Sequence, residues 1–235
     1  MKREKTILAC GALVCFAAAL VFGMFTVPKA APAGAVYTQS GPVIVIDPGH
    51  GGEDGGAVAA DGTPESGINL AISLKTRDIF ELFGVKTLMT RESDAVNFAS
   101  GDTIKSRKAS EMRGRVEMIN STPGVFLLSV HQNFFTKSKY HGAQVFFSPN
   151  DPVGAETAVF IQEYLRVSAD PENTRKAAAI ADSVYLMKNK KCSGILIECG
   201  FLSNPEETEK LKDASYQLTL AKAICAGLME YYVCE

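Results

Sequence analysis

Residues 43–52 read VIVIDPGHGG, and this stretch indicates the fold class. The β-branched run 43–46 predicts a short buried strand, which the following Asp-Pro-Gly ends in a loop. His50 therefore comes just after the carboxyl end of a strand. Ligands bind at that edge of an open α/β sheet, so the first strand already marks a candidate functional edge.

Strand and helix patterns alternate from this stretch to residue 232. We expect further strands at 85–89, 125–130, 144–147 and 195–197. We expect helices at 68–83, 111–119, 155–167, 174–187 and 214–232, with a polar loop over 93–110. Strands that alternate with helices predict one α/β domain built on a largely parallel sheet.

The amino terminus has the pattern of an export signal. Basic residues precede the uncharged apolar run 7–25, and a stretch rich in Pro and Ala follows it. The run is nearly long enough to span a bilayer, so a cleaved signal peptide and a membrane anchor both stay open. We expect this leader over 1–35, a linker over 36–42 and an exported domain over 43–235.

Composition excludes several classes of protein. The chain has 235 residues, of which 46% are apolar and 21% charged, which excludes a collagen-like or wholly disordered chain. The formal net charge of −2 gives no sign of nucleic-acid binding. Contact with a membrane is expected only through the leader, and the oligomeric state is left open.

The six cysteines do not form an obvious disulfide set. Two lie in the apolar leader. Cys192 and Cys199 flank a predicted strand at roughly 20 Å, and Cys225 and Cys234 are about 13 Å apart along a helix, so neither pair can close. We favour free buried thiols, and a bridge between the two regions stays open.

Four side chains are candidates for chemistry. His131 and Glu198 end the predicted strands 125–130 and 195–197, as His50 ends the first, and Glu65 stands just before a helix. Two histidines and one carboxylate are the ligands of a zinc site that keeps a position open for water. A second carboxylate can act as general base on that water. The pattern therefore predicts a zinc hydrolase site.

Other interpretations of these residues are weaker. Glu65 alone would be a solvated acid beside a helix dipole, whereas Glu198 directly after an apolar strand would be semi-buried and needs a charge or metal partner. The chain has no His-Glu-x-x-His, no Walker lysine after the glycines at 49–52 and no Gly-x-Ser-x-Gly around Ser129. We expect His141, which precedes a strand, at the surface or the substrate edge.

Widely spaced motifs link the chain to a known family. They are Asp47-Pro48-Gly49-His50-Gly51-Gly52, Glu65-x-x-x-Asn69-Leu70, Thr90-Arg91, Ser129-x-His131-x-Asn133 and Glu198-x-Gly200-Phe201-Leu202-Ser203-Asn204. With these motifs in order over residues 43–232, the chain resembles the zinc-dependent N-acetylmuramoyl-L-alanine amidases. One departure is Cys199, where the family usually has a small aliphatic residue. Alternation along the strand should turn its thiol away from Glu198.

The resemblance implies a fold and a set of roles. The fold is a single α/β domain with a twisted, largely parallel (mixed) sheet flanked by helices on both faces. His50, Glu65 and His131 would bind Zn²⁺, and Glu198 would be the catalytic glutamate. The substrate would be peptidoglycan, cleaved between muramic acid and L-alanine.

One branch of the family is more similar than the others. The stretch 100–109, SGDTIKSRKA, and the lack of a separate wall-binding module resemble the sporulation branch, which trims spore cortex peptidoglycan so that muramic-δ-lactam can form for germination. That branch implies action in the cell wall or the forespore intermembrane space, with the need for an accessory sporulation protein left open. Another zinc-dependent peptidase or aminoacylase of the same architecture, or a non-catalytic cell-wall-binding protein, are the alternatives.

Overall fold

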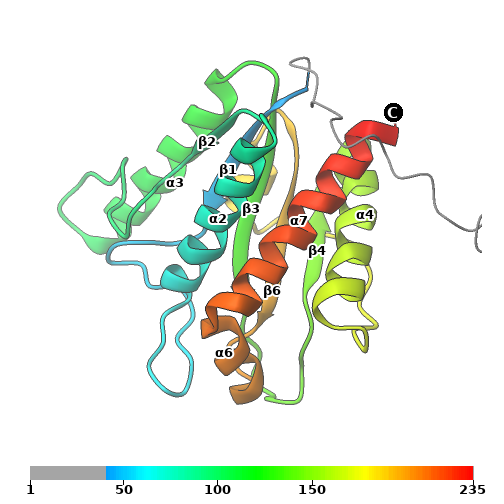
Figure 1. Cartoon of the computed structure of the whole chain (residues 1–235). Coiled ribbons are helices and arrows are strands. Elements are labelled where there is room, and N and C mark those ends of the chain that lie inside the picture. Colours follow the sequence, from blue (N-terminus) through cyan, green and yellow to red (C-terminus); the bar gives the residue numbers. More distant parts are fainter. Residues whose placement is uncertain (1–40, 235) are drawn as a thin grey trace, which may run out of the picture. The chain divides into compact units, whose positions relative to one another are not determined.

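The computed structural model describes residues 41–234, and a mixed six-stranded sheet runs through them (Figure 1). The elements in chain order are β1 Val43–Pro48, α2 Glu65–Leu82, β2 Thr87–Met89, α3 Ile104–Ser121, β3 Val125–Asn133, β4 Gln144–Phe147, α4 Pro152–Ala169, β5 Ala178–Ala179, α5 Tyr185–Asn189, β6 Ser193–Phe201, α6 Pro205–Lys212 and α7 Ala214–Cys234. The predicted leader at 1–35 lies outside the described residues.

The order of the strands brings three of them to one functional edge. The sheet runs β2-β1-β3-β6-β4-β5. β1 is parallel to β2 and β3, and β3 is parallel to β6, whereas β4 pairs antiparallel with β6. The largely parallel, mixed sheet is therefore confirmed. The carboxyl ends of β1, β3 and β6 lie side by side because these three strands are parallel neighbours.

Both faces of the sheet are covered by helices. Alternate residues such as Ile46, Leu128 and Ile197 are fully buried in the larger core, beneath α2, α4 and α7 (Figure 1). The intervening residues, such as Val45 and Leu127, pack with residues of α3 and α5 on the other face. Each fully buried aliphatic side chain contributes about 1.5–3 kcal/mol, so the central strands anchor both layers.

Two predicted segments were wrong. The expected loop 93–110 is helical from Ile104, because Thr103 and Ser106 form a reciprocal capping box at the start of α3. The expected helix 174–187 is instead a loop, the short strand β5 and the short helix α5. Asn173 starts this loop by accepting a hydrogen bond from the Arg175 backbone, and β5 then pairs with β4.

Smaller differences concern the ends of elements. α2 begins at Glu65 rather than at residue 68, and β3 and β6 continue three and four residues beyond their apolar runs to Asn133 and Phe201. α6 was not predicted; Asn204 caps it and Pro205 is its first residue. Cys192, Cys199 and Cys225 are free thiols. Within residues 41–234, no helix has the length and apolar character to cross a membrane.

Candidate metal centre and its surroundings

The loop after β1 has little room for side chains. His50 adopts a left-handed backbone conformation, with φ of 60°. A Cβ added at Gly49 would lie 2.2 Å from Cε1 of His131, and one added at Gly56 would lie 2.6 Å from Oε2 of Glu65. Glycine at these two positions therefore lets the backbone pack directly against neighbouring side chains at the sheet edge.

Two buried arginines, Arg91 and Arg115, hold this loop; we call them the guanidinium clamp. Arg91 donates from Nε to the carbonyl oxygens of Pro48 and His50, and from Nη2 to that of Gly49, at 2.8–3.0 Å. Arg115 donates to the same carbonyls of Pro48 and His50, at 3.1 and 2.7 Å. Burial and the charge of Arg115 lower the pKa of Arg91 to about 10, so both residues stay charged at neutral pH.

Buried acids balance the clamp. Asp47 accepts hydrogen bonds from Thr90, Ser129 and Arg115, and Glu111 accepts one from Arg115 at 2.9 Å. Burial alone would raise the pKa of Asp47, but Arg115 and the hydroxyl donors outweigh it and hold the pKa below its usual range. Asp47 therefore stays ionised and compensates the charge of the buried arginines.

His50, Glu65 and His131 come together above this network. One ligand atom from each lies within 4.8 Å of the others, which is a group that could hold a metal ion. His131 follows Val130 within β3, Glu65 is the first residue of α2, and the two histidine rings meet edge to face at 5.0 Å. The sequence-predicted residues thus reach one point from three separate elements.

Glu65 is fixed as an ionised group. It is 3% exposed, and its two oxygens accept hydrogen bonds from the backbone N–H groups of Ala57 and Gln132 and from the side chain of Asn69. Its Oε1 also lies 2.9 Å from Nδ1 of His131. Burial would raise the pKa of Glu65, but His131 and the other donors lower it to about 2. A carboxylate held in this way suits a cation.

Asp54 orients His50, a role that sequence analysis did not assign. Its Oδ2 lies 2.9 Å from Nδ1 of His50, which leaves Nε2 facing Glu65 at 3.3 Å. Lys108 of α3 donates to the other Asp54 oxygen at 2.7 Å. A carboxylate on the far nitrogen of a ligand histidine is the usual support of a metal site, and the four-residue spacing was the only sequence signal for it.

Glu198 lies beside this group on the neighbouring strand. It pairs in register with His131 across β3 and β6, so both side chains share one face of the sheet. Its Oε2 is buried and has no hydrogen-bond partner among the described atoms. Burial raises the pKa of Glu198 to about 7, and the charge of Glu65 adds to the rise while His131 and His50 oppose it. A buried carboxylate with an unpaired oxygen suits proton transfer.

The remaining candidates lie away from the group. Cys199 is buried in the core on the opposite face from Glu198, as expected, and burial raises the pKa of its thiol. His141 is exposed, with Nδ1 3.6 Å from a carboxylate oxygen of Asp170. Ser129 donates to Asp47 within the buried network.

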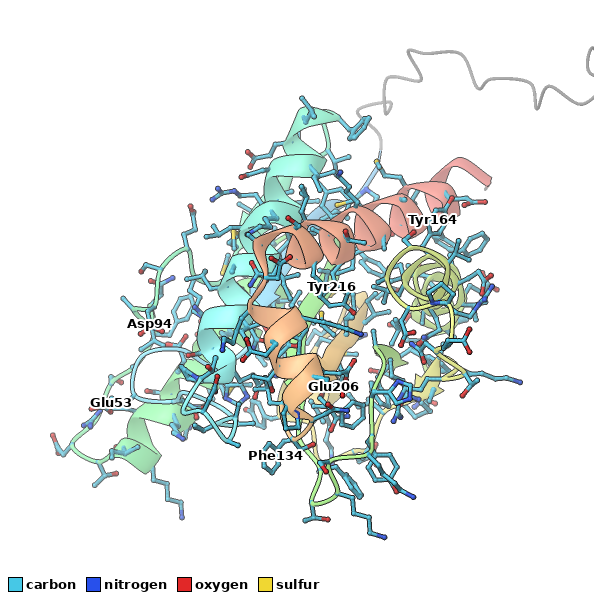
Figure 2. All side chains as sticks on the ribbon, turned by 60° about the horizontal axis from the view of Figure 1, so that its bottom comes forward. Glu53, Asp94, Phe134, Tyr164, Glu206 and Tyr216 are labelled. Carbon is cyan, nitrogen blue, oxygen red and sulfur yellow. The ribbon has the colours of Figure 1, made fainter. Side chains whose placement is uncertain are left out.

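A cavity of about 440 Å³ opens beside the two histidines. His50 and His131 line it, with Asp47 and Arg115 of the buried network, and an apolar wall includes Met112 of α3 and Leu186 of α5. Figure 2 turns this edge of the molecule forward, with Glu53 and Phe134 labelled on loops that follow β1 and β3. A bound molecule at this edge therefore meets polar reacting groups and an apolar wall together.

Comparisons with known proteins agree with this architecture. Residues 44–230 match the sequence profile of the family described as N-acetylmuramoyl-L-alanine amidase. The chain is 38% identical to the germination-specific N-acetylmuramoyl-L-alanine amidase of Bacillus subtilis over 194 residues, which cover 82% of this chain and 81% of the relative. It is 27% identical to the N-acetylmuramoyl-L-alanine amidase AmiA of Escherichia coli, over 81% and 76% of the two chains.

A solved structure matches as well. The CwlD amidase of Clostridioides difficile, determined in complex with the GerS lipoprotein, superimposes with a TM-score of 0.80 at 36% identity. The match covers 83% of this chain and all of the other. The predicted resemblance is thus confirmed in sequence and in fold: the chain belongs to the N-acetylmuramoyl-L-alanine amidase family.

Proposed function

We propose that this amidase is an exported zinc enzyme that hydrolyses the amide between muramic acid and the L-alanine of the stem peptide. One observation carries the proposal: two imidazoles and an ionised carboxylate lie within 4.8 Å of one another, beside a buried carboxylate with an unpaired oxygen. Family membership favours this reaction over a peptidase, an aminoacylase or a non-catalytic wall protein.

The donor set fits zinc. His50, Glu65 and His131 would hold the ion, since two imidazoles and one carboxylate are the ligands of hydrolytic zinc sites and leave one position open. Bound zinc would supply a Lewis acid that polarises the lactyl carbonyl and a lowered pKa for water. Asp54 keeps His50 in orientation, and the hydrogen bonds to Glu65 keep its oxygens in place.

Glu198 would move the proton. It takes a proton from the water that attacks the lactyl carbonyl, and it gives that proton to the alanine nitrogen as the C–N bond breaks. Burial favours the protonated form of Glu198 and raises its pKa, which makes the carboxylate a better proton acceptor for the first step. The products are a muramic lactyl carboxylate and a peptide with a free amino terminus.

The relatives support a biological setting for this reaction. One relative is named germination-specific, and the solved CwlD amidase is bound to a lipoprotein. We infer that this chain acts on spore cortex peptidoglycan on the route to muramic-δ-lactam, with an accessory protein as partner. The leader expected at 1–35 would export it to the cell wall or the forespore intermembrane space.

Mass spectrometry of digested peptidoglycan tests the reaction. Purified protein with zinc should release stem peptides that begin with free L-alanine and leave glycan with free lactyl carboxylates. A Glu198→Gln variant is the control, because it keeps the size of the side chain and removes the proton acceptor. A new alanine carboxylate in place of the lactyl one would contradict the proposal.

A further inference from the structure

A second pocket lies on the β4 side of the sheet. It is open, has a volume of about 500 Å³ and includes Lys139, His141, Gln144 and Arg175 in its lining. The loop that begins at Phe134, labelled in Figure 2, leads to it. None of the described residues that line it carries a carboxylate. Its charged side chains are therefore cations, which suits an anionic ligand.

Arg175 is held in position by neutral groups. Its Nε donates to the carbonyl oxygen of His141 at 2.8 Å, and its Nη1 donates to Oε1 of Gln144 at 3.1 Å. The guanidinium lies 4.5 Å from the centroid of the Phe201 ring. These contacts fix the plane of a half-buried guanidinium without neutralising its charge.

Arg175 also has no acidic partner in the part of the chain that the structure describes. Arg77, Arg107 and Arg115 all form ion pairs with carboxylates, and Arg175 forms none. Of the acids on the neighbouring loops, Glu207 accepts hydrogen bonds from the backbone of Gly142 and Phe201, and Asp170 lies 3.6 Å from Nδ1 of His141. Nη2 of Arg175 donates to no described acceptor, so its two N–H groups are available to a ligand in the plane of the guanidinium.

The register of the sheet ties this pocket to the proposed active site. Gln144 on β4 pairs directly with Glu198 on β6, so the two side chains share a face about 5 Å apart at Cβ. Arg175, bonded to Gln144, therefore lies one strand beyond the proposed base, on the side away from His131. An extended peptide advances about 3.3–3.6 Å per residue, so one or two residues cover that step.

We propose that Arg175, with Lys139 in the lining of the same pocket, binds a carboxylate of the peptide that leaves in the reaction. This inference rests on the proposed function, because it places the reacting amide between His131 and Glu198. The ligand is an acidic peptide whose first or second residue after the alanine bears a free carboxylate. The site makes Arg175 a specificity determinant that distinguishes a carboxylate from a carboxamide at that position.

A pair of substrates tests the pocket. Zinc-loaded full-length protein is assayed on a muramoyl-alanyl-glutamate and on its glutamine counterpart. For Arg175→Gln, KM for the acid should rise about 10- to 100-fold, in line with the loss of a charge-assisted hydrogen bond, while KM for the amide changes less than about threefold. Arg175→Lys should recover part of the preference. Lys176→Gln, which removes an adjacent charge outside the pocket lining, should leave both KM values unchanged.

Equilibrium binding separates this inference from the proposed function. Titration calorimetry with the alanyl-glutamate dipeptide and its glutamine counterpart needs no turnover, and zinc content and melting temperature of each variant report on folding. Tighter binding of the acid than of the amide, lost in Arg175→Gln, supports the pocket even if hydrolysis fails. Equal affinities in the wild-type protein, or equal losses for both peptides in Arg175→Gln, would overturn it.

Discussion

Adding one methyl group at Gly49 should disrupt the proposed metal centre. The new Cβ would lie 2.2 Å from Cε1 and 2.3 Å from Nε2 of His131, about 1.2 Å short of an ordinary 3.4 Å contact. The loop cannot move away easily, because the guanidinium clamp binds the carbonyl oxygens of Pro48, Gly49 and His50. The imidazole of His131 must therefore move by about 1 Å.

That displacement is large for a metal ligand. Zinc–nitrogen bonds are about 2.0–2.1 Å long and tolerate about 0.2 Å. Loss of a mere outer-shell partner weakens metal binding by about 10–100-fold, so Gly49→Ala, which displaces a ligand, should weaken zinc binding by at least about 100-fold. Activity should fall with the zinc content, and excess zinc should restore it only in part.

Competition with a chromophoric chelator measures the affinity, and circular dichroism checks that the variant is folded. Gly67→Ala is the matched control, since its Cβ meets no atom within 4 Å on the exposed face of α2. It should bind zinc normally and gain about 0.5–1 kcal/mol in stability from the loss of a helical glycine. A folded Gly49→Ala protein with wild-type zinc affinity would show that His131 is not a ligand.

Four further changes probe the proposed base, a proposed metal ligand, the buried charges and the clamp. Glu198→Gln should keep its zinc and turn over about 10²–10⁴-fold more slowly, whereas Glu65→Gln should lose zinc and turnover together. Metal analysis and an assay of peptide release separate the two results. The reverse pattern would mean that the roles of Glu65 and Glu198 are exchanged. Asp47→Asn should cost about 3–5 kcal/mol in urea unfolding, because it leaves Arg115 without its strand partner. The pKa of Asp47 is lower in the folded protein than its value of about 3.9 in the unfolded chain. Its contribution to folding stability is therefore complete above the unfolded pKa and is lost as the pH falls through the folded pKa. The Asp47→Asn variant should lack this loss of stability in acid. Arg91→Lys, which cannot reach three carbonyls at once, should lower zinc affinity more than it lowers the melting temperature.

The sequence predicted those parts of the fold that depend on continuous burial. The apolar runs 43–46, 125–130 and 195–197 were predicted as strands, and they lie in the three neighbouring strands in the middle of the sheet. Segment 174–187 is rich in good helix formers, yet the Asn173 turn and pairing with β4 outweigh that preference. The start of α3 was missed because its first turns are polar and depend on capping.

The candidate site could also be predicted only in part from the sequence. His50, His131 and Glu198 could be placed from their positions after apolar strands, since neighbouring parallel strands share an edge. The environment of each residue could not be predicted, because it depends on contacts distant in sequence. Arg115, for example, is 65 positions from the carbonyl of His50 that it binds. No local pattern in the sequence reports such a contact.

Those distant contacts explain how the centre can be ordered before metal binds. A left-handed His50 costs about 1–3 kcal/mol, and hydrogen bonds from charged donors contribute about 1.5–3 kcal/mol each. Three N–H donors of the clamp reach the carbonyls of Pro48 and His50, with the single Nε–H of Arg91 shared between the two, so the loop conformation is stabilised by the protein itself. Zinc binding then need not order the loop, and more of its binding free energy remains for affinity. The clamp therefore links the charges buried beneath the sheet edge to the affinity of the proposed metal site above it.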